Sequence, residues 1–573
     1  MYTVSKSTQI ILSLLKQHGI DQVIINPGGT NIPLVQGIQN DSFFTCYSIV
    51  DERSAMYFAI GLYLQTGKPV ALSCTSAQAT RNYIPGLTEA FYKHVPILAI
   101  TTSKHPKYWG QEYMQAPIQT SLPIDAVKQT FALPYVSSKT DELLCVRMVN
   151  EAMLELTHRM SGPVQLNIPM LDRETGVFNV SELPPVRLIK RYMSWDGWND
   201  VALTGKKIMI VVGEHRPFSD TQTAIINAFV ESHNAFVYIN HLSNYKGKYS
   251  VSANLALFAE SRTEKPDLLI TIGDQTGDYP VFGRLASGSQ TDFEHWRVAE
   301  DGAIVDTYDK LTKVFECPLE LFFSRLAGCK QVEHTYYEAW QKLQVSMSIP
   351  EELPFSNAYL AQQLVGAIPN NSYLNLAILN SLRIWSFFPL DPSIICNSNV
   401  AAFGIDGCVS VLLGQSVATD ELCFLVIGDL AFFYDMNSLG IRHIKNNVRI
   451  LLVNNHCGAE FKLYSNAANQ FGKGTDDYIA AAGHNGNAKG WAETTGFKYL
   501  SANNKKEFLQ YKDEFVSESE QSIVFEVFTT HTNESEALRT IIDNNLSSIG
   551  ALKGKVRSVI GNKGVIALKS MLR

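Results

Sequence analysis

Short apolar runs separated by helix-like stretches recur along almost the whole chain, and this alternation limits the fold more than any other feature. Such runs include "QVIINPGG", "PVALSCTS", "KKIMIVVGEH", "ELCFLVIGD" and "SIVFEVFT". Strands that alternate with helices build parallel sheets with helices packed on both faces. The sequence therefore predicts an α/β protein made of doubly wound domains with parallel sheets.

We expect three consecutive domains of this kind, because 573 residues exceed what a single hydrophobic core serves. The Pro-bearing stretches "SELPPVRLIKRYMSWDGWND" and "QVSMSIPEELPFSN" interrupt the alternation and are typical of linkers. The predicted parts are an N-terminal domain at 1–185, a central α/β domain at 200–345, a C-terminal domain at 354–540 and a tail at 541–573.

Composition excludes several classes of protein. The net charge is -7 and the basic residues are scattered, so we expect no nucleic-acid partner. No apolar run reaches the length of a membrane span, and the N-terminus indicates an amphipathic helix rather than a signal peptide. Nine cysteines without a CxxC spacing fit reduced thiols, and we expect a cytoplasmic protein.

Two buried strand runs of the predicted C-terminal domain end in oxygen-bearing side chains, one at Gly428-Asp429 and the other at Asn454-Asn455. Because ligands of open α/β sheets lie at the carboxyl ends of strands, we expect these side chains to share one crevice. Carboxylate and amide oxygens suit Mg²⁺, which is often shared with a bound phosphate. The alternative is that both pairs are ordinary loop residues, and the pair alone leaves this open.

A carboxylate also follows a strand in the predicted N-terminal domain. Glu52 lies where "FTCYSIV" runs into the helical stretch "DERSAMYFAIGLYLQTG". Asp51 and Glu52 could both serve only to cap that helix. The turns "NPGGTNIP" and "TSAQATRNYIPG" follow two neighbouring strands, and their small residues let a ligand approach the backbone closely. Three strand ends are thus expected to converge on one carboxylate.

Together these motifs resemble the thiamine diphosphate-dependent 2-oxo acid decarboxylases and carboligases. The turns "NPGGT", "DERSA", "TSAQA" and "FGIDG" and the stretch "GDLAFFYDMNSL" carry the resemblance, which covers the chain to about residue 540. Within that family the chain is most similar to the 2-succinyl-5-enolpyruvyl-6-hydroxy-3-cyclohexene-1-carboxylate (SEPHCHC) synthases of menaquinone biosynthesis. The resemblance implies the thiamine diphosphate-binding fold, with thiamine diphosphate and Mg²⁺ as cofactors.

The resemblance also implies roles for single residues. Asp429 and Asn455 would bind Mg²⁺ through their side chains, and Cys457 would bind it through its backbone carbonyl. Glu52 would hydrogen-bond the aminopyrimidine ring of the cofactor and thereby promote loss of the thiazolium proton. Ile405 would support the bent cofactor, although an ordinary core isoleucine is the alternative. The remaining cofactor contacts would come from Pro27, Gly28, Thr75, Ser76, Gly428, Leu430 and Ala431.

The chain departs from the SEPHCHC synthases where their substrates carry carboxylates. Arginines of those synthases fall on neutral or weakly basic positions here, and Glu460 replaces an apolar residue. Arg383 and Lys104 are the basic residues left to hold a carboxylate. Gln115 and Glu460 are expected to take part in catalysis. The predicted substrate contacts are Gly29, Thr30, His105, Arg383, Val400 and Phe461.

We therefore expect an enzyme that decarboxylates a small 2-oxo acid such as pyruvate and transfers the acyl carbanion to a sugar or aldehyde, forming a C–C bond. A genuine SEPHCHC synthase and a simple decarboxylase are alternatives. An acetolactate-synthase-like enzyme with FAD is another, although the middle block carries no dinucleotide-binding turn and we assign it no cofactor. A non-catalytic thiamine diphosphate-binding protein is the remaining alternative. The family builds its site from two subunits, so we expect a homodimer or homotetramer.

The tail "LSSIGALKGKVRSVIGNKGVIALKSMLR" lies outside the resemblance. Its basic residues are interleaved with Leu, Val, Ile and Met, and it contains no acidic residue. Such a segment is typical of docking on an anionic membrane or on a partner protein. The alternative is a C-terminal helix packed on its own subunit.

Overall fold

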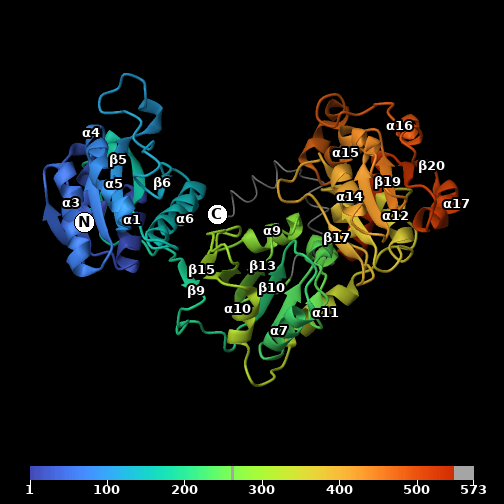
Figure 1. The fold of residues 1–573 in the computed structure, drawn as a ribbon, viewed down its shortest axis with the longest axis horizontal. Coiled ribbons are helices and arrows are strands. Elements are labelled where there is room, and N and C mark those ends of the chain that lie inside the picture. Colours follow the sequence, from blue (N-terminus) through green and yellow to red (C-terminus); the bar gives the residue numbers. More distant parts are fainter. Residues whose placement is uncertain (260–262, 547–573) are drawn as a thin grey trace. The chain divides into compact units, whose positions relative to one another are not determined.

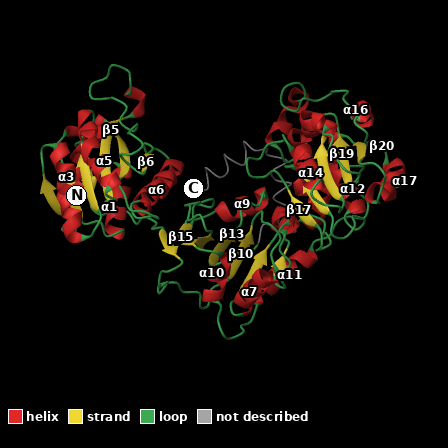
Figure 2. Ribbon diagram, viewed as in Figure 1, coloured by secondary structure: helices red, strands yellow, loops and turns green. Residues whose placement is uncertain are grey.

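The computed structural model describes residues 1–259 and 263–546. Contacts divide the chain into two compact units, each treated by itself below. The first unit combines Met1–Asp196 with Asp301–Glu316, and the second combines Gly197–Glu300 with Cys317–Arg573. Figure 1 shows the elements in sequence colours, and Figure 2 shows helices packed around the strands of each sheet.

The first unit is built on a parallel sheet with the strand order β3-β2-β4-β5-β7-β6. One core lies under α1, α2 and α6, and a second lies under α3 and α5 on the strands β2, β4 and β5. The strands are β2 (Gln22–Ile25), β3 (Thr45–Ser48), β4 (Val70–Cys74), β5 (Ile97–Lys104), β6 (Gln129–Ala132) and β7 (Val164–Met170), with a small antiparallel pair of β1 (Tyr2–Thr3) and β8 (Phe178–Val180). The helices are α1 (Lys6–Gln17), α2 (Ile32–Gln39), α3 (Glu52–Thr66), α4 (Gln78–Asn82), α5 (Ile84–Tyr92) and α6 (Lys139–Glu155).

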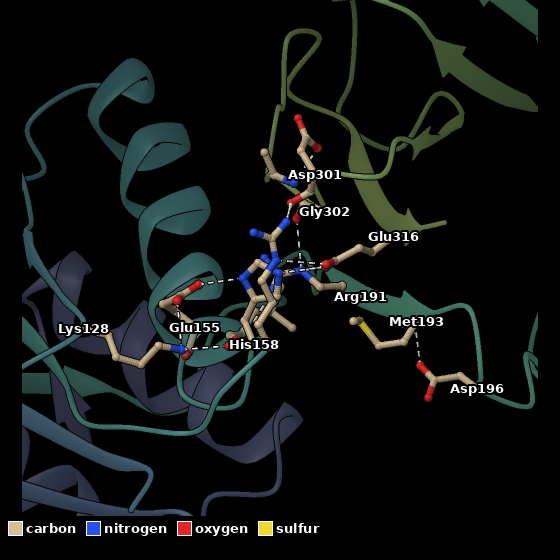
Figure 3. Close-up of polar contacts among 12 residues, drawn as sticks. Lys128, Glu155, His158, Arg191, Met193, Asp196, Asp301, Gly302 and Glu316 are labelled. Carbon is tan, nitrogen blue, oxygen red and sulfur yellow. Dashed lines mark hydrogen bonds and ion pairs between the residues drawn. The ribbon is translucent and has the colours of Figure 1, made fainter. Parts of the chain in front are cut away.

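A charged network fastens a distant segment of the chain to this unit (Figure 3). β9 (Lys190–Met193) pairs in parallel with β15 (Leu311–Glu316), which ends at Glu316. The Glu316 carboxylate lies 2.7 Å from His158 Nε2 and accepts a 3.2 Å hydrogen bond from Arg159 Nε. His158 Nδ1 lies 3.1 Å from Glu155, which also pairs with Lys128 Nζ at 2.9 Å. These contacts explain why residues 301–316 belong to the first unit.

The second unit contains a parallel arrangement of β12, β11, β10, β13 and β14 in that order. Their apolar side chains are buried, as the continuous runs "IMIVV" and "LLITI" predict for a sheet covered on both faces. The strands are β10 (Ile208–Val212), β11 (Ala235–Tyr238), β12 (Ser250–Val251), β13 (Leu268–Ile272) and β14 (Glu294–Val298), and the helices are α7 (Asp220–Glu231), α8 (Asn254–Ala259), α9 (Tyr279–Ala286), α10 (Leu319–Leu326) and α11 (Thr335–Ser346).

The same unit holds another parallel sheet with the order β17-β16-β18-β19-β21-β20. β18 and β19 are adjacent, and Gly428 pairs with Val453, so both strands end at one edge. The strands are β16 (Tyr373–Leu376), β17 (Ile395–Asn397), β18 (Cys423–Gly428), β19 (Val448–Asn454), β20 (Lys498–Ala502) and β21 (Ile523–Phe528). The helices are α12 (Asn357–Leu364), α13 (Asn380–Trp385), α14 (Cys408–Ser416), α15 (Asp429–Asp435), α16 (Lys489–Thr494), α17 (Lys505–Val516) and α18 (His531–Asn545).

The predicted fold class is confirmed, because parallel α/β sheets recur along the chain. The predicted boundaries of three domains stay predictions, since contacts group the chain into two units. All nine cysteines are free, and seven of them are buried. Among residues 1–259 and 263–546, no helix is both long and apolar enough to cross a membrane. The predicted tail begins within α18, and its part after residue 546 lies outside the described residues.

Candidate active site

Thr30 ties together the two small-residue turns that follow β2 and β4. Its Oγ1 lies 2.9 Å from Thr75 Oγ1 and 2.8 Å from Thr102 Oγ1, and it accepts a 3.0 Å hydrogen bond from the Ser76 amide. Gly28 allows this approach, because a Cβ on it would lie 2.1 Å from the Thr75 Cβ. The structure thus brings Gly28, Thr75 and Ser76 together. Thr30 is only 4% exposed, and its hydroxyl holds the two loops together instead of facing a substrate.

The Ser76 hydroxyl in this loop is a buried polar group with unused hydrogen-bonding capacity. Ser76 is 3% exposed, and its Oγ has no hydrogen-bond partner within the described part of the chain. The next residue, Ala77, has a φ of 76°, a left-handed conformation that costs free energy in a residue other than glycine. Strain and an unpaired hydroxyl at one strand end are the features expected of a loop that holds a ligand.

Asp51 and Glu52 have different roles. Asp51 is the N-cap of α3 and accepts hydrogen bonds from the amides of Arg53 and Ser54 at 2.9 and 3.3 Å. Those same contacts hold the pKa of Asp51 below its usual value. Glu52 instead turns its carboxylate toward Asn82 at the end of α4, which donates a 3.0 Å hydrogen bond. The capping alternative therefore holds for Asp51 and not for Glu52.

Asp429 lies at the end of β18 and is only 2% exposed. Its Oδ2 accepts hydrogen bonds from the amides of Asn455 and Cys457 at 3.1 and 3.2 Å, and its Oδ1 accepts from the Leu430 amide at 2.7 Å. His484 Nε2 lies 3.2 Å from Oδ2 as well. Burial raises the pKa of Asp429, and these hydrogen bonds together with His484 oppose that rise.

The oxygen atoms of Asp429 and its neighbours are suitable ligands for a hard cation. The carboxylate of Asp429, the side-chain amide of Asn455 and the carbonyl of Cys457 are oxygen ligands from two adjacent strand ends. His456 between them has a φ of 60°, so this loop is strained as well. Within the described ranges, no group of three His, Cys, Asp or Glu side chains is arranged to hold a metal ion. The predicted ligand set thus fits Mg²⁺, and Gly428 and Ala431 lie beside it.

Arg383 and Glu460 form a two-pronged ion pair near this strand end. Arg383 Nη1 lies 2.8 Å from Glu460 Oε2 and Nη2 lies 3.2 Å from Oε1, while Nη1 also donates to Asn380 Oδ1 at 3.0 Å. Both side chains are mostly buried. Glu460 follows Cys457 by three residues, so the pair borders the predicted metal loop. In this arrangement the guanidinium that was expected to bind a substrate carboxylate is occupied by a carboxylate of the protein.

The other predicted substrate residues differ in accessibility. Val400 is fully buried and packs against Gly277, whose added Cβ would lie 2.7 Å from Val400 Cγ1. Lys104 pairs with Asp172, and the adjacent His105 accepts a 3.2 Å hydrogen bond from the Lys107 amide. Pro27, Gly29, Gln115 and Phe461 are exposed. Ile405 is 39% exposed and lies outside the hydrophobic core of the described chain, and its contact with the cofactor stays a prediction.

Sequence reasoning missed Asn82 and His484, which contact Glu52 and Asp429. His484 is 55 residues from Asp429, in a stretch of short turns without apolar periodicity. Asn82 ends α4 three residues after the "TSAQA" turn, and this nearness to a predicted cofactor loop is the signal that the sequence offers.

Comparison with known proteins agrees with the family resemblance of the sequence. Residues 5–122 match the family model described as "Thiamine pyrophosphate enzyme, N-terminal TPP binding domain". Proteins named 2-succinyl-5-enolpyruvyl-6-hydroxy-3-cyclohexene-1-carboxylate synthase are similar over most of their length. The one from Bacteroides thetaiotaomicron is 33% identical and the alignment covers 94% of this chain and 98% of that protein. The Phocaeicola vulgatus protein gives the same three values, and the Bacteroides fragilis protein is 32% identical over 94% and 99%.

A solved structure, the Rhodococcus jostii RHA1 thiamine diphosphate-dependent 4-hydroxybenzoylformate decarboxylase, is also similar. It has a TM-score of 0.43 and 18% identity, and the alignment covers 91% of this chain and 99% of that one. We draw nothing further from so distant a likeness.

The parallel α/β sheets and the matched N-terminal domain define a thiamine pyrophosphate-dependent enzyme. Within this class, the chain belongs to the family of the 2-succinyl-5-enolpyruvyl-6-hydroxy-3-cyclohexene-1-carboxylate synthases. The resemblance stated from the sequence is confirmed. The relatives favour the SEPHCHC synthase alternative over the expectation of a different carboligase.

Proposed function

We propose that this chain is a thiamine diphosphate- and Mg²⁺-dependent SEPHCHC synthase. The observation that carries the proposal is the similarity to three synthases of that name over at least 94% of this chain and 98% of theirs. The strand-end carboxylates Glu52 and Asp429 support it, since each is held by contacts that suit a cofactor site.

The name of the product defines the substrates by its chemistry. Its 2-succinyl group is a four-carbon acyl chain that ends in a carboxylate, which is what 2-oxoglutarate leaves after loss of CO₂. The ring with its enolpyruvyl, hydroxyl and carboxylate groups corresponds to isochorismate. We therefore propose that one C–C bond forms between the carbonyl carbon of the donor and the ring of isochorismate, and that CO₂ is the by-product.

When bound, thiamine diphosphate would supply a nucleophilic carbon for the 2-oxo group and a cationic thiazolium ring that takes up the electron pair left by CO₂. Asp429, Asn455 and the Cys457 carbonyl would hold Mg²⁺ and through it the diphosphate. Glu52 would hold a proton at the aminopyrimidine ring nitrogen, and Asn82 would fix its carboxylate at 3.0 Å. Ser76, with its unpaired hydroxyl, and Ile405, with its exposed side chain, would contact the cofactor.

We also propose a homodimer or homotetramer as the assembly. α3 carries the exposed apolar side chains of Tyr57, Phe58 and Leu64 directly after Glu52, and Val50 precedes it with 76% exposure. Burial of such side chains at a subunit interface would stabilise the association. Light scattering coupled to gel filtration measures the mass, and a monomer at micromolar concentration with both cofactors present would contradict this assembly.

The direct test is the reaction itself. Purified protein with thiamine diphosphate and Mg²⁺ should release CO₂ from 2-oxoglutarate and convert isochorismate to a product with the mass of SEPHCHC. The Asp429→Ala variant serves as the control for metal-dependent turnover. Cofactor-loaded protein that releases CO₂ from another 2-oxo acid and not from 2-oxoglutarate would contradict the synthase assignment.

A second candidate is a carboligase that uses a smaller donor such as pyruvate and passes the acyl group to an aldehyde or sugar. The Arg383–Glu460 ion pair favours it, because the guanidinium already binds two carboxylate oxygens of the protein. The second carboxylate of 2-oxoglutarate would have to displace Glu460 or go unbound. Competition between pyruvate and 2-oxoglutarate for CO₂ release separates the two candidates.

A further inference from the structure

A small polar cavity in the second unit borders the Arg383–Glu460 pair. It lies between α8, the loop that leads into α9, and α13, and it has about 20 Å³ of free volume. That volume accommodates one water-sized group. Its polar lining includes Asn240, Asn254, Asp278 and Arg383, and Phe403 is one of its apolar lining residues. The cavity is therefore lined by Arg383, a predicted substrate contact, and by a residue two positions before Ile405.

Asp278 and Asn254 form the polar centre of this cavity. Asp278 Oδ2 accepts hydrogen bonds from the Tyr238 hydroxyl at 2.9 Å and from Asn254 Nδ2. Its Oδ1 accepts from the Val281 amide at 3.4 Å, a long contact that leaves capacity for another donor. Asn254 is 5% exposed, and its Oδ1 has no partner among the residues that the structure describes. The pair thus offers a free acceptor, Oδ1 of Asn254, beside a carboxylate oxygen with remaining acceptor capacity.

The charges around the cavity disfavour an anionic ligand. Arg383 is the cation in its lining, and Glu460 and Asn380 already occupy both Nη atoms of its guanidinium. Burial raises the pKa of Asp278 to about 6, and the positive charge of Arg383 opposes that rise. Within the lining, Asp278 and Asn254 supply acceptor oxygens, and the Glu460 carboxylate is already bound to the guanidinium of Arg383. A neutral group that donates a hydrogen bond therefore suits this lining better than an anion does.

We propose that this cavity is the subsite for a hydroxyl group of the second substrate, which donates a hydrogen bond to the Asp278–Asn254 pair. This inference rests on the proposed function and extends it to the acceptor. Both candidate acceptors, the hydroxylated ring and a sugar-like aldehyde, supply such a hydroxyl. Asp278 also caps α9, so the alternative is that the pair is purely structural and the cavity holds one water molecule.

Two aldehydes that differ by one hydroxyl group test the subsite in the cofactor-loaded protein. Glycolaldehyde and acetaldehyde are offered as acceptors with 2-oxoglutarate and with pyruvate as donors. We expect wild-type protein to prefer glycolaldehyde at least tenfold in kcat/KM, because a site built for a hydroxyl leaves its acceptors unpaired with the deoxy analogue. Asn254→Leu, which is close to isosteric, and Asp278→Asn, which retains a capping oxygen, should both lose most of this preference.

Tyr238→Phe is the matched control, because it removes a hydrogen bond to Asp278 Oδ2 from outside the cavity lining and keeps the Asp278–Asn254 pair. The preference should survive in this variant. Equal use of the two aldehydes by wild-type protein, or an unchanged preference in Asn254→Leu, would overturn the subsite and leave a structural water site.

A binding measurement decides the matter if neither aldehyde is consumed. Saturation-transfer NMR compares glycerol with propane-1,3-diol, which lacks one hydroxyl, on wild-type protein and on Asn254→Leu. Stronger transfer to glycerol that is lost in the variant supports the subsite, and equal transfer in both proteins overturns it. Failure of the proposed function is distinguishable, because it shows as an absence of CO₂ release from 2-oxo acids whatever the acceptor.

Discussion

His484 Nε2 lies 3.2 Å from Oδ2 of Asp429, the same oxygen that accepts the amides of Asn455 and Cys457. Three donors therefore converge on one carboxylate oxygen from two separate segments of the chain. Loss of a group that orients a metal ligand by hydrogen bonding typically lowers metal affinity or activity 10–100-fold. We infer that His484 is a positioning residue for Asp429.

The metal assignment predicts graded losses of cofactor affinity. Asp429→Asn should weaken Mg²⁺-dependent thiamine diphosphate binding more than 100-fold, because a strongly hydrated cation loses its charged ligand. His484→Gln should weaken it by roughly 10–100-fold. Asp420→Asn, at an exposed carboxylate, is the control and should bind normally. Isothermal calorimetry with and without Mg²⁺ measures all three, and wild-type affinity in Asp429→Asn would refute the metal site.

The different contacts of Asp51, which caps α3, and Glu52, which faces Asn82, give the second prediction. Glu52→Gln should keep cofactor affinity within a few-fold and slow hydrogen–deuterium exchange at the thiazolium carbon, since an amide hydrogen-bonds the ring but does not favour its protonated form. Asp51→Asn should leave the exchange rate unchanged and alter only the cap of α3, because asparagine is also a good N-cap residue. NMR of the bound cofactor reports the exchange. Equal rates in wild type and Glu52→Gln would exclude this role.

The parts of the site that the sequence predicts are those set by strand order. Asp429 and Asn455 could be paired in advance, because parallel neighbouring strands end at one edge and each strand is a short apolar run with a polar stop. The turns around Gly28 and Thr75 follow the same rule. The residues alone do not separate Asp51 from Glu52, because both carboxylates occupy the same helix start. The family resemblance assigned the cofactor contact to Glu52, and the structure shows that the two side chains point in different directions.

Side-chain pairs between distant segments could not be predicted from the sequence. Arg383 in α13 and Glu460 in a short 3-10 helix are 77 residues apart, and no periodicity links them. Val400 was placed at the substrate on motif position alone, whereas packing against Gly277 buries it. Asn254 and Asp278 lie in the part of the chain that contains β10 to β14, where the sequence contains no cofactor-binding motif. Such contacts depend on how neighbouring layers pack, which local pattern does not encode.

The Arg383–Glu460 pair predicts a change in donor preference. Glu460→Gln should free the guanidinium and raise kcat/KM for 2-oxoglutarate relative to pyruvate by about 10–100-fold, because a charge-assisted hydrogen bond contributes about 1.5–3 kcal/mol. The double variant Arg383→Met with Glu460→Gln should show no such gain. Steady-state CO₂ release with each donor measures the ratio. An equal gain in single and double variants would mean that Arg383 does not contact the donor.

The charged network of the first unit predicts a stability effect. The Glu316 carboxylate is 9% exposed and faces His158, Arg159 and Arg191. Glu316→Gln should lower the free energy of unfolding by about 1–3 kcal/mol, because it removes the charged acceptor of His158 and Arg159 and one of the carboxylates around the buried Arg191. Glu142→Gln breaks an exposed pair with Lys139 and should cost less than about 1 kcal/mol. Urea unfolding compares the variants, and equal midpoints would show that the network adds nothing.

Glu534 in α18 predicts how the stability of the second unit depends on pH. Burial raises its pKa to about 7, against a smaller opposing effect of the Thr529 hydroxyl, which donates at 2.7 Å, and of the Asn357 amide. The folded protein therefore holds a proton on Glu534 that the unfolded chain loses near pH 4.5. The stabilisation is complete below pH 4.5 and is lost as pH rises toward 7, by about 3 kcal/mol for the fully buried carboxyl.

Glu534→Gln should remove this slope, because an amide keeps acceptor capacity for Thr529 and does not titrate. We expect the variant to gain stability relative to wild type at pH 8 and to match it at pH 4.5. Glu536→Gln, on the exposed side of the same helix, should retain the wild-type slope. Urea unfolding at both pH values gives the difference. A wild-type slope that persists in Glu534→Gln would show that Glu534 is not the source of the pH dependence.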